Sequence, residues 1–212
     1  MSDANHTQLA QPLNPAQILA GSQRPDFDVI ANWIPQGAHV LDLGCGDGTL
    51  LHKLITERAI TGYGVEKNDA NVAACVAKGL PVLQQDLESG LAWFEDDSFD
   101  VAVLSLTLQA VHETENIMRE IVRVGKKAIV SVPNFGFWQH RLAVIRGRMP
   151  VSKTLPYEWY NTPNVRVLTL KDFEILARDV GCRVTRRVVL HDEQVVNFMP
   201  NLRGSLAVFE MQ

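Results

Sequence analysis

Short apolar runs alternate along the chain with segments in which apolar residues recur every three or four positions. Uninterrupted apolar runs are typical of strands buried on both faces, and the longer spacing is typical of helices that cover a sheet. The expected strands are residues 39–43, 61–66, 81–85, 100–106, 128–132, 183–190 and 205–209. The expected helices are residues 25–34, 49–57, 69–78, 114–123 and a segment that begins at Thr169. This alternation predicts an α/β protein with a mostly parallel sheet that ends in an antiparallel strand pair.

Two parts of the chain fall outside this alternation. Residues 1–20 are polar and show little apolar periodicity, so we expect a flexible N-terminal segment there and a single domain over residues 21–212. Residues 134–166 are rich in proline and aromatic side chains. We expect this segment to be a lid or an insertion.

The most informative pattern follows the first expected strand. Gly44, Gly46 and Gly48 lie between that strand and a helical run that begins at Thr49. Glycines let the backbone turn tightly and approach a ligand, and a helix start offers unpaired N–H groups. The spacing is G-x-G-x-G, whereas a pyrophosphate of a dinucleotide is expected to bind G-x-G-x-x-G. The loop therefore predicts a small polar ligand other than a dinucleotide.

Acidic residues occur where the first three strands end. Asp47 lies inside the glycine loop, where a carboxylate suits a ligand with an amino group. Glu66 ends the second strand and can accept hydrogen bonds from ribose hydroxyls, and Asp86 follows the third strand. The bland alternative is that the glycines only form a tight turn and the acids only cap helices.

In this order, the loop and the acids resemble the Rossmann-like sheet of class I S-adenosylmethionine-dependent methyltransferases. The resemblance implies S-adenosylmethionine or S-adenosylhomocysteine as the ligand, with the adenine near Asp86. The residues expected to bind it are Asp42, Gly44, Cys45, Gly46, Asp47, Glu66, Asp86 and Leu87.

Composition limits the other classes of function. With 212 residues and 46% hydrophobic side chains, the chain is long enough for one domain with a sizeable core. A net charge of −4 gives no global electrostatic reason to bind nucleic acid or an anionic membrane. The polar N-terminus resembles no signal peptide, no run has transmembrane length, and we expect a cytoplasmic protein. Cys45, Cys75 and Cys182 are far apart and form no C-x-x-C pair, so we expect small buried residues and neither a disulfide framework nor a metal site.

No residue is assigned to catalysis. Methyl transfer is an in-line displacement that needs positioning more than a nucleophile. The fourth strand runs into Ser105–Gln109 without the Asn/Asp-Pro-Pro-aromatic turn of many methyltransferases that act on amino groups. His112 suits a general base, but an exposed or capping histidine is the favoured interpretation. Phe137 and Trp138 suit either a substrate pocket or packing against the sheet.

Five further stretches resemble one family, the methionine-biosynthesis proteins MetW. They are Val40–Gly48, Leu106–Gln109, Val130–Gly136, Gly147–Pro150 and Leu155–Asn164. Leu106 stands where this family leads us to expect Gln, and Asn161 where we expect Asp. Neither position therefore receives a role from the resemblance.

The MetW resemblance implies an accessory role more than methyl transfer. Proteins of this family are associated with homoserine O-acyltransferase, so we expect that enzyme as a protein partner, with the S-adenosylmethionine pocket reporting the state of the pathway. A small-molecule methyltransferase and a free-standing ligand sensor are the alternatives.

The composition of residues 134–166 also suits a partner surface. Arginines are interleaved there with large side chains such as Met149, Tyr157, Trp159 and Tyr160, and protein interfaces concentrate both in their anchors. A nucleic-acid surface is disfavoured by the acidic chain. A lid with inward aromatics and solvated arginines has equal weight with an interface.

Overall fold

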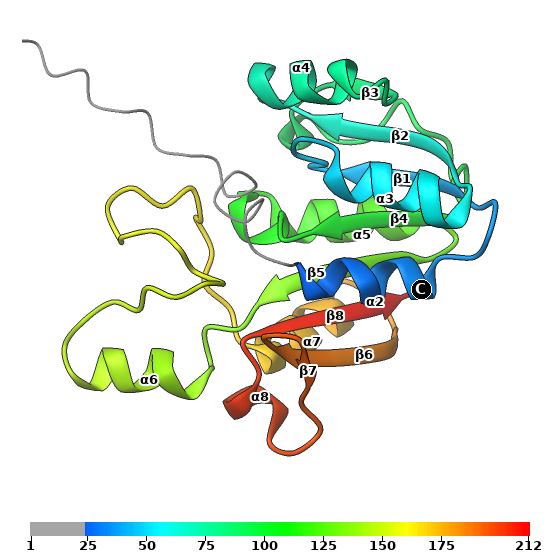
Figure 1. Cartoon of the computed structure of the whole chain (residues 1–212). Helices are drawn as coiled ribbons and strands as arrows, with labels where there is room; N and C mark the ends of the chain where they lie inside the picture. The colour runs from blue at the N-terminus through cyan, green and yellow to red at the C-terminus, as the bar shows by residue number, and fades with distance from the viewer. Residues whose placement is uncertain (1–23) are drawn as a thin grey trace, which may run out of the picture.

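The computed structural model describes residues 24–212, which form one eight-stranded sheet with helices on both faces (Figure 1). The expected flexible segment, residues 1–20, lies outside the described residues. Within residues 24–212, no helix is long and apolar enough to cross a membrane.

The sheet has the strand order β3-β2-β1-β4-β5-β8-β6-β7. The strands β1 (His39–Leu43), β2 (Thr61–Glu66), β3 (Val82–Gln84), β4 (Val101–Ser105) and β5 (Ala128–Pro133) are parallel. Strand β8 (Leu206–Met211) lies antiparallel between β5 and β6 (Val184–His191), and a short β7 (Gln194–Val195) forms the edge. The mostly parallel sheet with an antiparallel C-terminal pair is confirmed, and β7 is an addition to it.

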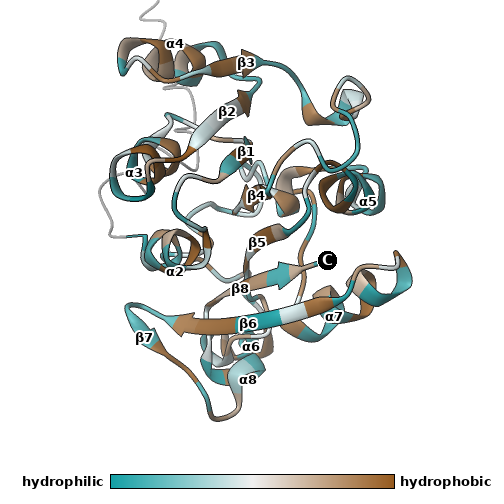
Figure 2. Ribbon diagram, turned by 90° about the vertical axis from the view of Figure 1, so that its right-hand side faces the viewer, coloured by the Kyte–Doolittle hydropathy of each residue, from teal (hydrophilic) through white to brown (hydrophobic). Residues whose placement is uncertain are grey.

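Helices cover the sheet in two layers (Figure 2). One face carries α2 (Pro25–Trp33), α3 (Thr49–Arg58) and α4 (Asp69–Ala77), and the other carries α5 (Thr114–Val124) and α7 (Leu170–Asp179). In β4, Val101 and Val103 belong to the core cluster with α2 and α3, whereas Ala102 and Leu104 belong to the core cluster with α5 and α7. Both faces of the central strands are therefore buried, which explains their uninterrupted apolar runs.

The start of α7 illustrates how local signals fix an element. The Thr169 hydroxyl accepts a hydrogen bond from Asp172 N, and the Asp172 carboxylate accepts one from Thr169 N. This reciprocal pair satisfies two N–H groups that a helix start leaves unpaired. The predicted helix start at Thr169 is confirmed.

Residues 134–166 contain a helix that the sequence pattern did not predict, α6 (Trp138–Ile145). The rest of the segment is irregular and projects from the carboxyl ends of the parallel strands (Figure 1, left). His140, on α6, is buried, and its ring nitrogens lie 3.0 Å from Asn134 O and 2.9 Å from Ser152 Oγ. This one side chain thereby ties the helix to both flanking loops. The remaining short elements are the 3-10 turns η1 (Leu87–Ser89) and η2 (Leu108–Ala110) and the helix α8 (Pro200–Arg203).

Candidate cofactor site

The loop between β1 and α3 turns sharply because its glycines adopt left-handed backbone angles. The φ angles are 71° at Gly44, 57° at Gly46 and 78° at Gly48, values that residues with a Cβ atom avoid. The N–H groups of Gly44 and Cys45 donate to Val65 O at 2.8 and 3.1 Å, which holds the loop against β2. The predicted strand, turn and helix start are therefore present.

Glu66, the last residue of β2, organises the backbone around this loop. Its Oε2 accepts a hydrogen bond from Gly46 N at 3.0 Å, and its Oε1 accepts from Lys67 N and Asn68 N, both at 2.8 Å. These donors keep the carboxylate in one orientation beside the cavity. Because a carboxylate has about four acceptor sites and these donors use three, about one site, on Oε2, can accept from a ligand.

Asp42 presents an unpaired oxygen. The residue is only 1% exposed, and no described residue donates to its Oδ2. Burial raises the pKa of Asp42 to about 7. The positive charge of Arg24 opposes this increase, and the negative charge of Glu66 adds to it. A buried oxygen without a donor costs about 1–3 kcal/mol. A ligand N–H or ammonium group would relieve that cost.

Asp47 is already engaged with protein groups. Its Oδ1 accepts from Thr49 N at 3.1 Å, and its Oδ2 lies 2.9 Å from Lys78 Nζ. Partial burial acts to raise the pKa of Asp47, but the hydrogen bonds from Thr49 and Lys78 outweigh it, and the pKa lies below its usual value. Asp47 therefore caps the start of α3, and its contact with a ligand amino group stays a prediction.

Cys45 and Cys75 meet behind the loop, although thirty positions separate them. Their Sγ atoms are 4.0 Å apart, and Cys75 Sγ donates to Gly46 O at 3.3 Å. The expectation of buried cysteines is confirmed for all three. Burial raises the pKa of Cys45, and the nearby Asp42 raises it further, so the thiol stays protonated. A protonated thiol is a poor nucleophile, which suits a packing role.

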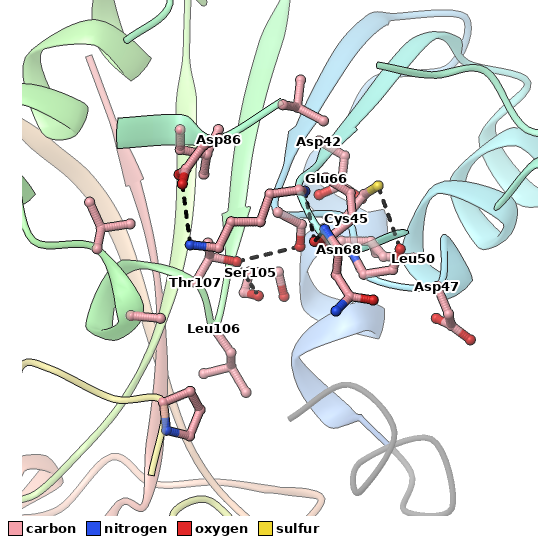
Figure 3. A pocket seen from close by; sticks show the side chains of 18 of the residues that line it. Asp42, Cys45, Asp47, Leu50, Glu66, Asn68, Asp86, Ser105, Leu106 and Thr107 are labelled. Atoms are coloured by element: carbon pink, nitrogen blue, oxygen red, sulfur yellow. Dashed lines mark hydrogen bonds and ion pairs between the residues drawn. The ribbon is translucent and has the colours of Figure 1, made fainter. Parts of the chain in front are cut away.

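The loop opens into a cavity of about 580 Å³ at the carboxyl ends of the parallel strands (Figure 3), where α/β sheets bind ligands. Asp86 follows β3; its carboxylate accepts from Glu88 N at 3.1 Å and lies 3.5 Å from Lys67 Nζ. All eight residues predicted to bind the ligand line this cavity, namely Asp42, Gly44, Cys45, Gly46, Asp47, Glu66, Asp86 and Leu87. The fold therefore places these residues, which follow or end three different strands, around one cavity. Their contact with a cofactor stays a prediction.

A buried ion pair supports the wall of the cavity beside α2. Arg24 lines the cavity, and its Nε and Nη2 donate to Asp26 at 2.9 and 2.7 Å. Asp26 is fully buried and also accepts from the Ser105 and Ser131 hydroxyls at 3.1 and 3.0 Å. The serine partners come from β4 and β5, which sequence spacing does not connect.

The irregular part of residues 134–166 forms the opposite wall. Tyr157, Asn161, Thr162 and Pro163 all line the cavity, as does Leu106, which follows β4 with a left-handed φ of 50°. Tyr157 was expected among interface aromatics, but it is 8% exposed and faces inward. The two positions that depart from the family pattern, Leu106 and Asn161, therefore both lie beside the cavity.

Three other candidates do not line the cavity. His112 is exposed; its backbone N–H donates to Glu88 and its carbonyl accepts from Arg166, so only backbone groups of this residue are held within residues 24–212. Phe137 is 2% exposed and packs against His191, with ring centroids 4.7 Å apart, whereas Trp138 is 46% exposed. The general base at His112 and the substrate-pocket role of Phe137 gain no support.

The chemistry of the cavity fits S-adenosylmethionine. The orphaned Asp42 Oδ2 suits the ligand's amino group, and the Glu66 carboxylate has acceptor capacity for a ribose hydroxyl. Arg24 supplies a cation for a carboxylate. Within the described residues, no cluster of three or more His, Cys, Asp or Glu side chains can hold a metal ion.

Solved structures with the same fold include S-adenosylmethionine-dependent methyltransferases. The enzyme from Archaeoglobus fulgidus is 13% identical with a TM-score of 0.67, over 88% of this chain and 90% of that one. The enzyme from Methanosarcina mazei is 20% identical with a TM-score of 0.64, over 87% and 96%. The [4+2]-cyclase SpnF shares the fold with a TM-score of 0.64 at 18% identity, over 88% and 79%. The class I methyltransferase fold is therefore confirmed, and SpnF shows that proteins with this fold have other activities.

The sequence comparisons identify the family. The profile described as methionine biosynthesis protein MetW matches residues 24–211. A curated relative, the bifunctional methionine biosynthesis protein MetXA/MetW of Rhodopirellula baltica, is 36% identical over 197 residues. The match covers 86% of this chain but only 32% of the relative, so the chain spans about a third of that protein. The chain belongs to the MetW family of methionine biosynthesis proteins.

Proposed function

We propose that the protein is an accessory subunit that binds homoserine O-acyltransferase and supports its activity. The observation that carries the proposal is the bifunctional relative MetXA/MetW, whose name joins MetXA and MetW in one chain. Two activities joined in one polypeptide stay at high effective concentration, and separate chains achieve the same proximity by binding each other. The partner of this chain is therefore the counterpart of the MetXA part.

The cavity adds a ligand to this role. S-adenosylmethionine or S-adenosylhomocysteine would be held by Glu66 at the ribose, Asp86 near the adenine and Asp42 at the amino group. The buried, unpaired Oδ2 of Asp42 supports this assignment, since a ligand donor would satisfy it. Because both ligands carry this amino group, Asp42 does not by itself distinguish them.

Copurification and enzyme kinetics test the proposal. The cognate homoserine O-acyltransferase is assayed alone and with this protein, with and without S-adenosylmethionine, and the mixture is run on a size-exclusion column. We expect a co-eluting complex with a higher acyltransferase rate. Separate elution at micromolar concentrations together with an unchanged rate would contradict the accessory role.

A small-molecule methyltransferase is the second candidate. It is favoured by the part of the cavity beyond the acidic residues, where Leu106, Ala110 and Pro163 leave an apolar wall beside the predicted cofactor. The sulfonium would supply the methyl group there. Transfer of label from methyl-labelled S-adenosylmethionine to a small molecule of a cell extract would support this activity.

A further inference from the structure

The segment Tyr157–Pro163 faces the cavity and the solvent at once. Tyr157, Asn161 and Pro163 line the cavity, whereas Trp159 and Tyr160, between them, are 71% and 70% exposed. The two exposed rings pack edge to face with centroids 5.7 Å apart. A ligand in the cavity and a protein on the outer surface would therefore contact the same short segment.

The two exposed rings leave a large apolar area in contact with water. Tryptophan and tyrosine bury large areas when they bind and are enriched among the residues that dominate binding energy. Figure 1 shows the segment projecting from the carboxyl ends of the parallel strands, away from the helices that cover the sheet. Since neither ring is buried in the core, the pair is available to a partner.

The insertion that carries this aromatic pair is also rich in basic side chains. Residues 134–166 contain five Lys or Arg and one Glu, although the whole chain has a net charge of −4. Arg146 and Arg148 are exposed, and no hydrogen bond of either side chain is found within residues 24–212. Ile145 and Met149, beside them in sequence, are 81% and 52% exposed. A complementary surface would present apolar pockets with carboxylates around them.

We propose that the outer side of the segment Tyr157–Pro163, which carries Trp159 and Tyr160, docks the acyltransferase, with Arg146 and Arg148 of the same insertion as further contacts, and that ligand in the cavity strengthens the docking. The inference rests on the proposed function, because the MetXA/MetW relative supplies the identity of the occupant. Ligand contacts on the inner side restrict the segment Tyr157–Pro163. A restricted segment loses less conformational entropy when the partner binds its outer side, so the coupling is positive.

Affinity measurements on the full chain and the acyltransferase test the docking surface. We expect Trp159→Ala combined with Tyr160→Ala to weaken the complex at least about tenfold, as loss of central aromatic anchors does. Arg146→Ala combined with Arg148→Ala should weaken it less and reduce its dependence on salt. Trp93→Ala is the matched control, since Trp93 is 63% exposed but lies in the loop before β4. Its affinity should equal that of the wild type.

The coupling is tested with S-adenosylmethionine and S-adenosylhomocysteine as probes. Saturating ligand should tighten the wild-type complex several-fold, and bound acyltransferase should tighten ligand binding by the same factor. The Trp159/Tyr160 double variant should keep its melting temperature and its ligand affinity in the absence of the partner.

Three experimental outcomes would each overturn a different part of the proposal. If the wild type binds no acyltransferase, the proposed function fails and this inference fails with it. If the wild type binds and the aromatic double variant binds equally well, only the docking surface is wrong. If the surface is correct but ligand leaves the wild-type affinity unchanged, the coupling is wrong.

Discussion

The backbone N–H of Gly46 donates a 3.0 Å hydrogen bond to the Glu66 carboxylate, so the residue that ends β2 also holds the glycine loop after β1. Glu66→Ala removes this hydrogen bond together with the proposed ribose contact. We expect S-adenosylmethionine to bind more weakly by about 1.5–3 kcal/mol, the usual contribution of a hydrogen bond to a charged group. Calorimetric titration measures the change.

The control for this variant is Glu193→Ala, which removes an exposed glutamate between β6 and β7. It should bind the ligand as the wild type does. Glu66→Gln separates the hydrogen bond from Gly46 from the charge offered to the ligand. The amide oxygen can still accept from a backbone N–H but carries no charge. If Glu66→Ala binds S-adenosylmethionine as tightly as the wild type does, the assignment of Glu66 to the binding site is wrong.

Asp42 predicts a pH effect on stability. Burial raises its pKa from 3.8 to about 7, so the folded state favours the protonated form. Stability is therefore greatest below pH 3.8 as far as this group is concerned, and it declines as the pH rises towards 7 and then levels off. Asp42→Asn keeps the shape without the charge. We expect the melting temperature of the variant to exceed that of the wild type by a margin that grows between pH 5 and about pH 7.

Ligand binding supplies the complementary measurement at Asp42. If the carboxylate receives the ligand's ammonium group, S-adenosylmethionine affinity of the wild type should rise with pH through about 7, as the carboxylate ionises. Asp42→Asn should bind more weakly and show a flatter profile. Identical pH profiles for the two proteins would show that Asp42 does not receive this group.

The features that the sequence predicted are those that local chemistry determines. The glycines of the β1–α3 loop, the apolar strand runs and the helix start at Thr169 all depend on interactions within a few residues, and each is confirmed in the structure. The acids at the ends of β2 and β3 converge because parallel strands end at the same edge of a sheet. The order of the strands and acids along the chain therefore predicted that these acids lie at the same edge of the sheet.

The features that the sequence missed depend on contacts between distant segments. Cys45 and Cys75 meet only because α4 packs beside the loop, and the cysteine spacing gave no sign of this. Tyr157 and Trp159 are both aromatic and two positions apart, yet one faces the cavity and the other the solvent. In irregular backbone no fixed period connects sequence position with side-chain direction, so composition could not assign their sides.

Breaking the Arg24–Asp26 ion pair should destabilise the folded state. Asp26→Ala leaves a guanidinium that is only 13% exposed without its carboxylate, and it removes the acceptor shared by Ser105 and Ser131. We expect the free energy of unfolding to fall by about 3–5 kcal/mol, as when one partner of a buried pair is removed. Urea denaturation measures the loss.

A double replacement controls for the cost of an unpaired charge. Arg24→Met combined with Asp26→Leu removes both charges and fills similar space, and such replacements are often nearly neutral. The double variant should therefore be more stable than Asp26→Ala alone. If the double variant is no more stable than Asp26→Ala, removal of the unpaired charge recovers no stability and the desolvation argument is wrong.

His140 predicts a loss of stability in mild acid. Burial lowers its pKa below the usual 6.5, although the Asn134 carbonyl, which accepts from Nδ1, opposes the shift. Above pH 6.5 the ring is neutral in both the folded and unfolded states, so stability does not depend on this group. As the pH falls below 6.5, the unfolded chain binds the proton first, and the free energy of unfolding declines by at most about 1.4 kcal/mol per pH unit. Thermal unfolding of the wild type and His140→Gln between pH 7 and about pH 5 gives this slope as the difference between the two proteins, because Asp42 contributes a slope of opposite sign to both. His52→Gln is the matched control, because His52 is exposed on α3 and its replacement should leave the slope unchanged. A wild-type slope that persists in His140→Gln would assign the acid sensitivity to another group.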